Sequence, residues 1–385
     1  YIEGDEKGSF RLLGIHDKKY KVNVPTLQEL SEANPYTVPA DWLKTDTITI
    51  RGRIEGYDAE KLGFTSMNCY YYNVFEKDGT TLIFDIAPDG TFEKKFQAYY
   101  PTYEVIAPDN SNIRFDNIPI FAHPGETIDI IIKPNEHGIY ECYYNNGSCK
   151  EVERWLKADL DMWELTKPIS EFKGNISEMD KVADQTWQDI LYIIQREATR
   201  QHFTTQEVQL ALANMQGSFI DAMANYIRNH RKGLTKVKEV DGEFDVEILD
   251  SIEWEELDQM EHYKVMQRID YDNPLLMCSD FHIVLNRIQI VGNIIRLKYK
   301  DVVVDEKGEY VFNIENEKKL LANYIQALRE LMGTDKNNLT IQFCVYNEMM
   351  NHFDKWLSRE ALLSNVMPVY LDVFTNPYIH QKAEA

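Results

Sequence analysis

The sequence predicts an α+β protein in which an N-terminal antiparallel β-sandwich is followed by an all-α helical domain. Up to about residue 145, short segments alternate apolar and polar residues, which is the pattern of strands with one buried face. Beyond Lys150 the apolar residues recur at helical spacing. With 44% hydrophobic and 12% aromatic residues, the 385-residue chain can bury substantial cores.

Six segments of the first part carry the strand pattern. Ile48, Ile50 and Ile54 share one parity, and so do Ile128, Ile130 and Ile132. Turn residues separate the segments, and short strands at such regular spacing are typical of a β-sandwich. The predicted strands are 46–57, 68–76, 80–86, 91–98, 103–107 and 126–134.

The second part carries five clear helical patterns. The clearest signal for the start of a helix is at Thr204. Glu207, three residues later, completes a capping box, and Phe203 can pack onto Val208. The predicted helices are 177–198, 203–230, 315–333, 338–358 and 359–374. Two further segments, 235–249 and 300–313, fit either small hairpins or ordered loops.

We expect three regions along the chain. Residues 1–44 form the tail of a preceding domain and a linker, residues 45–145 form the sandwich domain, and residues 150–380 form the helical domain. The chain begins without Met or a signal peptide and ends within a pattern, so both ends look cut. We therefore expect a segment of a longer, processed protein, with a C-terminal domain missing from this chain.

The stretch 268–290 contains acids, a cysteine and a histidine, and it fits either a catalytic loop or a joint between helices. Asn273 followed by Pro274 is typical of a helix start, and Ser279 is placed to cap a second helix. Asp270 and Asp272 precede a helix N-terminus, where negative charge is favoured. Each acid has a structural role, so we interpret the stretch as a joint.

The charge balance disfavours two classes of partner. The chain has 41 basic and 63 acidic side chains, for a net charge of −22. Nucleic acids and anionic lipids attract clusters of Lys and Arg, and the sequence contains no such cluster of any size. No apolar run approaches the roughly 20 residues that cross a bilayer. We therefore predict no nucleic-acid binding and no transmembrane segment.

The five cysteines have no Cys-x-x-Cys or metal-ligand spacing. Cys142 and Cys149 flank the tight-turn signal Asn146-Gly147, so they could form a disulfide in an oxidising compartment or remain two free thiols. Both alternatives stay open.

Two histidines fit structural roles better than chemical ones. Glu348 and His352 share a helix face at a spacing of four, but a metal site needs a third ligand, so we interpret them as a helix-surface pair. His282 lies beside the apolar stripe of its helix, without a nucleophile motif, and we interpret it as a structural histidine. The sequence therefore predicts no catalytic, cofactor-binding or metal-binding residue.

Four aromatic residues are candidates for a ligand surface. Tyr70 and Tyr72 alternate along one predicted strand, where stacking rings could hold a sugar or a peptide, although sheet packing is the simpler interpretation. Trp155 and Trp163 are eight residues apart and so fall near one helical face, where packing between sandwich and helices would also explain them.

The segments "ITIRGRIEGY", "IAPDGTFEKKF" and "PIFAHPGETIDIIIKP" resemble the β-sandwich that precedes the thioredoxin domain in TlpA-like thiol–disulfide oxidoreductases of the bacterial envelope. The family's turn motifs match residues 52–57, 89–92 and 124–127. The segments 269–287 and 375–383 resemble the helical region of the longer members, and residues 1–16 resemble the tail of a further N-terminal domain.

The resemblance implies a function for the chain, with one departure from the family. The family's catalytic Cys-x-x-Cys belongs to the thioredoxin domain, and no cysteine here matches it. We therefore expect a non-catalytic accessory region that positions a downstream thioredoxin-like domain or meets an envelope protein partner. The resemblance also implies a periplasmic, lipid-anchored full-length protein, and no cofactor is expected for this chain.

Two alternative functions stay open. The first is a glycan- or peptide-binding module of a surface or periplasmic protein. The second is a hydrolase whose catalytic residues are dispersed along the sequence, because triads assemble in space and not in sequence order.

Overall fold

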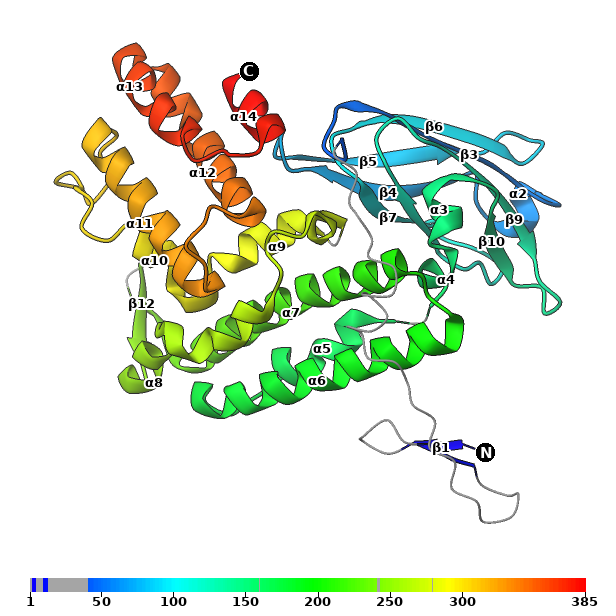
Figure 1. Ribbon diagram of the computed structural model, residues 1–385, viewed down its shortest axis with the longest axis horizontal. Coiled ribbons are helices and arrows are strands. Elements are labelled where there is room, and N and C mark those ends of the chain that lie inside the picture. Colours follow the sequence, from blue (N-terminus) through cyan, green and yellow to red (C-terminus); the bar gives the residue numbers. More distant parts are fainter. Residues whose placement is uncertain (1, 5–9, 13–40, 159, 241–242, 279) are drawn as a thin grey trace.

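The computed structural model describes residues 2–4, 10–12, 41–158, 160–240, 243–278 and 280–385, and it confirms the α+β class. Strands fill the N-terminal part up to Tyr144, and the helical part starts at Gly147 (Figure 1). Most of the predicted tail and linker, 1–44, lies outside the described residues, apart from the antiparallel pair β1 (Ile2–Gly4) and β2 (Phe10–Leu12).

The larger sheet contains β10 (Tyr140–Tyr144), β9 (Thr127–Pro134), β3 (Asp46–Ile54) and β6 (Thr91–Ala98), in that order. β3 runs parallel to β9 and antiparallel to β6, so the sheet is mixed and not wholly antiparallel. A parallel pair needs a long crossover connection. Here the connection from β3 to β9 contains β6 of the same sheet and four further strands, which form a second layer.

That second layer contains two antiparallel hairpins, β4 (Ser66–Asn73) with β5 (Asp78–Asp85) and β7 (Thr102–Ile106) with β8 (Ile118–Ala122). Paired backbone hydrogen bonds between Asn68 and Ala107 join the hairpins. Tyr71 packs on Phe96 at 5.0 Å between ring centroids, which brings the second layer against the first. The predicted alternation is confirmed where it was clearest, since Ile48, Ile50 and Ile54 are all buried.

The helical part is organised around two long helices, α6 (Ile176–Gln201) and α7 (Thr205–Gly233), which lie side by side (Figure 1). All five predicted helices are present. They are α6, α7, α11 (Ile314–Met332), α12 (Leu339–Leu357) and α13 (Glu360–Leu371). The other α-helices are α2 (Ala59–Leu62), inside the sandwich, and α3 (Gly147–Glu151), α4 (Glu153–Leu156), α5 (Met162–Ser170), α8 (Ser251–Glu256), α9 (Phe281–Ile288), α10 (Ile294–Lys298) and α14 (Pro377–Glu384).

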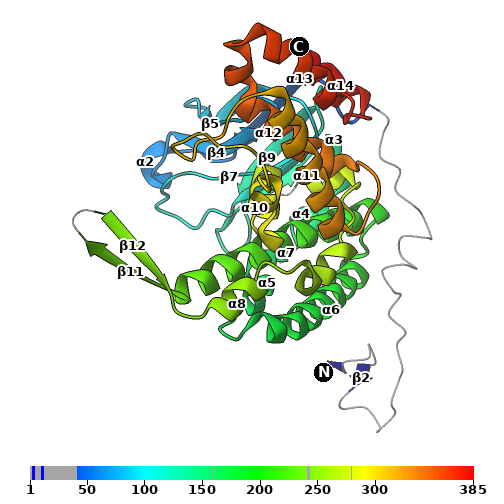
Figure 2. The ribbon, with the colours of Figure 1, turned by 90° about the vertical axis from the view of Figure 1, so that its left-hand side faces the viewer.

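The two ambiguous segments differ in structure. The first is a hairpin of β11 (Thr235–Val240) and β12 (Glu243–Ile248), which projects away from the helices (Figure 2). The second is a loop that contains an isolated bridge between Val304 and Tyr310, and the Asn316 side chain also bonds its backbone. Among the described residues, no helix has both the length and the apolar character that crossing a membrane requires.

The stretch 268–290 is a joint between helices, as predicted. Asn273 Oδ1 accepts a hydrogen bond from Leu275 N at 3.0 Å and so caps the short 3₁₀ helix Pro274–Cys278. The predicted cap Ser279 lies outside the described residues. Asp272 Oδ1 accepts from Leu339 N at 2.9 Å, so this acid ties the joint to the first turn of α12.

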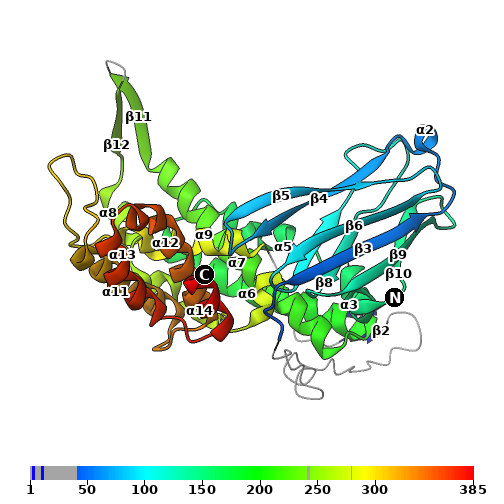
Figure 3. The ribbon, with the colours of Figure 1, turned by 90° about the horizontal axis from the view of Figure 1, so that it is seen from above.

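An aromatic cluster around Phe75 joins the sandwich to the helices, which lie to one side of it when seen from above (Figure 3). The buried Phe75 ring lies 5.3 Å from both Phe343 and Tyr346 of α12 and 5.5 Å from Tyr378 of α14. Tyr346 also donates a hydrogen bond to the Phe75 carbonyl at 3.1 Å. The two parts therefore share one continuous core.

The predicted capping box at the start of α7 is confirmed and has a second role. Glu207 is fully buried, and its Oε2 accepts from Thr204 N at 2.7 Å. Its Oε1 accepts from the backbone N–H groups of Arg154 and Trp155 at 3.1 and 3.3 Å. One carboxylate thus satisfies the N-termini of two helices.

We expect Glu207→Ala to lower the free energy of unfolding by about 3–5 kcal/mol, because it leaves several buried N–H groups without an acceptor. Urea denaturation measures this change. Glu178, at the same position of α6 but exposed, is the matched control, and Glu178→Ala should cost about 1 kcal/mol or less. Equal losses in the two variants would contradict this role of Glu207.

Candidate functional site

A hollow of about 550 Å³ lies where the sandwich meets the helices, and we name it the junction hollow. The end of β4 and the turn after it line one side, and α9, α10 and α12 line the other. Its volume falls within the roughly 300–1,000 Å³ that is typical of small-molecule sites. The fold thus offers a cavity of ligand size next to the aromatic cluster.

Two stacked rings form one wall of the junction hollow. Tyr72 of β4 and His282 of α9 lie 4.2 Å apart at an interplanar angle of 18°. A small recess on the other side of the same rings contains Glu104 and Asp280. Burial lowers the pKa of His282, which favours the neutral imidazole. Burial, followed by the nearby Asp280 charge, raises the pKa of Glu104 to about 8.

Three cations line the junction hollow, and they differ in how they are paired. Arg287 forms an ion pair with Asp221 at 2.6 Å, and Lys298 forms one with Glu348 at 2.7 Å. Lys77 instead bonds the amide oxygen of Asn351. Among the described residues, no carboxylate forms an ion pair with Lys77, and burial lowers its pKa.

A buried network of charges lies behind Lys298. Its ion-pair partner Glu348 also lies 3.5 Å from His352 Nε2, and His352 Nδ1 lies 3.1 Å from Glu317 Oε2. The Tyr370 hydroxyl donates to the same Glu317 oxygen at 3.2 Å. The prediction of a helix-surface pair is therefore wrong, because Glu348 and His352 are 2% and 6% exposed.

The burial of Glu348 and His352 has a physical cause that helical spacing cannot reveal. Their partners Lys298 and Glu317 come from α10 and α11, and buried charges persist only when they are paired. Both imidazole nitrogens of His352 already face carboxylates. Nowhere in the described parts of the chain do three or more His, Cys, Asp or Glu side chains form a group suited to a metal ion.

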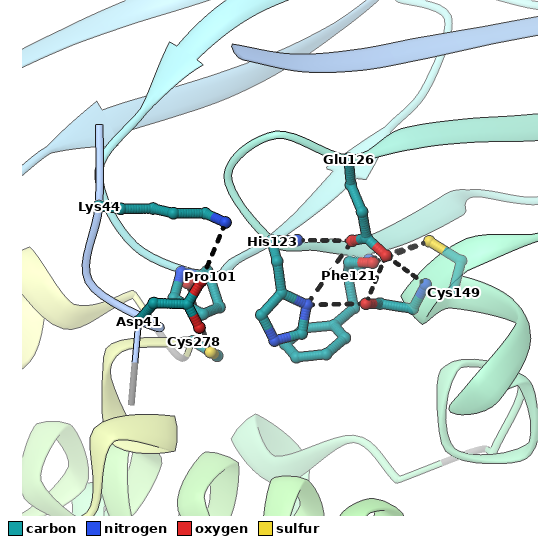
Figure 4. A network of polar contacts seen from close by, with 9 residues as sticks. Asp41, Lys44, Pro101, Phe121, His123, Glu126, Cys149 and Cys278 are labelled. Carbon is teal, nitrogen blue, oxygen red and sulfur yellow. Dashed lines mark hydrogen bonds and ion pairs between the residues drawn. The ribbon is translucent and has the colours of Figure 1, made fainter. Parts of the chain in front are cut away.

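A second polar cluster joins the turn before β9 to α3 (Figure 4). His123 Nδ1 lies 2.7 Å from Ser148 Oγ, and Glu126 Oε1 accepts from the same hydroxyl at 2.8 Å. A hydrolytic triad needs the hydroxyl and the carboxylate on opposite ring nitrogens. Here Glu126 Oε2 lies 3.6 Å from Nδ1, the nitrogen that faces the hydroxyl. This cluster fixes the turn and does not match a triad.

Cys149 lies next to that cluster but is fully buried, and its thiol donates to the Phe121 carbonyl at 3.1 Å (Figure 4). Cys142 is also a free, buried thiol in this structure. Burial raises the pKa of Cys142 to about 12 and raises the pKa of Cys149 as well, so neither thiol has thiolate character. The disulfide between them stays a prediction.

The four aromatic candidates for a ligand surface do not come together. Tyr72 lines the junction hollow and Tyr70 lines the recess beside it. Trp155 is buried against Tyr103, and Trp163 is 58% exposed. The two tryptophans share no helix face, because α4 ends at Leu156 and a new helix starts after Asp161, whose side chain accepts from Glu164 N.

Sequence reasoning missed most of the lining of the junction hollow. Lys77 lies in the turn between β4 and β5, and Arg287 and Lys298 lie on helices whose polar faces gave no motif. His282 was singled out, but only as a structural residue. A signal was present in part, since basic residues are outnumbered 41 to 63 by acidic ones, but spacing alone does not reveal that three of them converge.

Comparison with models of protein families and with curated proteins finds no match for this chain.

We expect Glu104→Gln to change how stability depends on pH. The folded protein keeps the Glu104 proton up to about pH 8, whereas the unfolded chain releases it near the ordinary value of about 4.3. The folded state thus binds more protons in this interval, so its stability is highest at acid pH and falls as the pH rises toward 8. Glutamine removes that loss.

Urea denaturation at pH 5 and pH 9 measures the effect. The variant should be more stable than the wild type by a larger margin at pH 9 than at pH 5. Glu55→Gln, at an exposed carboxylate of the same layered body, is the control and should show no such difference. A margin for Glu104→Gln that is equal at both pH values would contradict the raised pKa.

Proposed function

We propose that this chain is a non-catalytic accessory region of a TlpA-like thiol–disulfide oxidoreductase of the bacterial envelope. Its role is to position a thioredoxin-like domain that follows it in the full-length protein. The observation that carries the proposal is the arrangement of the three family-like turn motifs around a single strand, β3.

Each motif contacts β3 in a different way. The first, 52–57, starts within β3, which ends at Ile54, and continues into the turn that follows. In the second, 89–92, the Gly90 carbonyl accepts a hydrogen bond from Ile54 N at 2.9 Å. In the third, 124–127, the Glu126 carbonyl accepts from Thr49 N, also at 2.9 Å. Motifs as far apart in the chain as 52–57 and 124–127 thus meet at one strand. This supports the interpretation that all three belong to one family-like β-sandwich.

The backbone conformation of Gly90 explains why the second motif, 89–92, contains a glycine. Its φ of +85° is a left-handed conformation that other residues adopt at a cost. A Cβ atom at this position would also lie 2.5 Å from the Ile54 carbonyl oxygen. The Asp-Gly turn therefore permits the close approach of β3 to the β5–β6 connection.

The state of the cysteines supports a non-catalytic role. All five are buried, and burial raises the pKa of each thiol. A redox-active thiol must instead be exposed and have a lowered pKa. The reductase chemistry of the proposed protein would thus belong to the downstream domain, in the envelope compartment that the resemblance implies.

The position of α14 fits a role in orienting such a domain. Tyr378 of this last helix packs on Phe75 and bonds Thr45 at 2.7 Å between the hydroxyl oxygens. Lys382 lies over the Tyr99 ring at 4.4 Å. A segment joined to α14 would therefore start from a helix that is fixed to the sandwich.

The gene sequence beyond the codon for Ala385 is the most direct test. We expect the reading frame to continue into a segment with strands, helices and a Cys-x-x-Cys pair at a helix N-terminus. A full-length protein without that segment would contradict the proposal.

Thiol labelling tests the non-catalytic role of the chain itself. In the native protein we expect an aromatic disulfide reagent to react at least about 100-fold more slowly than with a free thiol, because protected thiols react only through opening of the fold. In denaturant without reductant, five thiols should react if Cys142 and Cys149 are free, and three should react if they are bonded.

The matching activity measurement is reduction of insulin disulfides by the chain alone. We expect no turnover above the reagent background. Fast labelling of any native cysteine together with measurable turnover would refute the non-catalytic role.

A further inference from the structure

The charged side chains that line the junction hollow are positive, whereas the molecule as a whole is negative. Three cationic side chains line it, and none of its lining residues, all within the described part of the chain, is Asp or Glu. The chain as a whole carries a net charge of −22. A hollow of ligand size that lacks the dominant charge of the protein is suited to an anion.

Lys77 is the cation that remains for a ligand. Arg287 and Lys298 already face Asp221 and Glu348, and those carboxylates neutralise them. Lys77 has a left-handed φ of 52° and bonds only the neutral amide of Asn351. The Glu348 charge acts on Lys77 but forms no ion pair with it. A single ammonium group outside an ion pair matches a ligand with a single negative charge, whereas phosphate sites gather several cations or N–H groups.

Side-chain amides form much of the remaining polar lining. The oxygens of Asn286 and Gln289 accept from Arg287 and Lys298 at 2.9 and 3.4 Å, so these two amides have N–H groups to offer a ligand. Asn347 adds a third amide, with one acceptor and two donors. Amides that both donate and accept are matched to hydroxyl groups, which also do both.

The stacked pair of Tyr72 and His282 adds aromatic surface to the lining of the same hollow. Aromatic rings pack well against the apolar face of a compact ligand while polar groups bind its edges. The combination of one free cation, several amides and one aromatic wall is that of a site for a polyhydroxylated ring with one carboxylate.

We propose that the junction hollow binds a hexuronate unit, an acidic sugar whose carboxylate pairs with Lys77. Its hydroxyl groups bond the side-chain amides, and its ring packs against Tyr72. This inference does not depend on the accessory role proposed above, and it narrows the glycan-binding alternative to one class of sugar at one site.

Isothermal titration calorimetry at low salt tests the proposal with D-galacturonate and D-glucuronate, each against its neutral counterpart D-galactose or D-glucose. Each pair differs in the group at one carbon, a carboxylate or a hydroxymethyl. We expect at least one acid to bind about tenfold or more tightly than its neutral partner, because a charge-assisted hydrogen bond is lost in the neutral sugar. Acetate should bind more weakly than the sugar acid.

Variants locate the site. Lys77→Gln should weaken binding of the acid about tenfold or more, to the level of the neutral sugar, and Lys77→Arg should restore most of it. Lys94→Gln removes the same charge from another half-buried lysine, outside the hollow, and should leave binding unchanged. An unaltered melting temperature of Lys77→Gln establishes that the variant is folded.

Trigalacturonate distinguishes two sources of the ligand. Tighter binding than the monosaccharide would indicate a unit within an acidic polysaccharide, and weaker binding would indicate a free sugar acid. Both outcomes support the hexuronate site. Equal binding of acid and neutral sugars, acetate as tight as the sugar acid, full binding by Lys77→Gln, or no binding of either acid would overturn it.

Discussion

The structure depends on the packing of Phe75 between the sandwich and the helical part. This side chain follows β4, and its ring contacts α12 and α14, which are formed more than 260 residues later in the chain. Burying an aromatic side chain of this kind contributes several kcal/mol. Because the contact is central and apolar, it holds the two parts in a fixed relation and also fixes the edges of the junction hollow, whose lining comes from both.

The charged groups near this core follow from the same constraint. Once α10, α11 and α12 pack together beside the sandwich, Lys298, Glu348 and Glu317 are removed from water and must be paired. Lys77 lies at the edge of the core, where it can stay charged without an acidic partner. The fold thus separates neutralised charges, which stabilise the interior, from one cation that can face a ligand.

The sequence predicted the features that depend on local pattern. The β-to-α change, the capping box at Thr204, the joint at Asn273 and the five main helices follow from periodicity and end signals. β8 was missed because it is a short apolar run without alternation. β10 was overlooked, although its residues alternate and turn residues flank it. The burial of His352, the parallel pairing of β3 with β9 and the separation of Trp155 from Trp163 depend on contacts between distant segments or on a helix break, which spacing cannot reveal.

Hydrogen exchange of native protein tests the central claim that Phe75 makes the two parts one cooperative body. In the wild type, the slowest amides of β3 and of α12 should exchange with the same free energy, that of global unfolding. In Phe75→Ala, which we expect to cost about 3–5 kcal/mol, α12 and α14 should open at lower free energy than β3. Phe64→Ala, inside the sandwich, should not make α12 and α14 open at lower free energy than β3. Amides of β3 and α12 that already differ by several kcal/mol in the wild type would contradict the account.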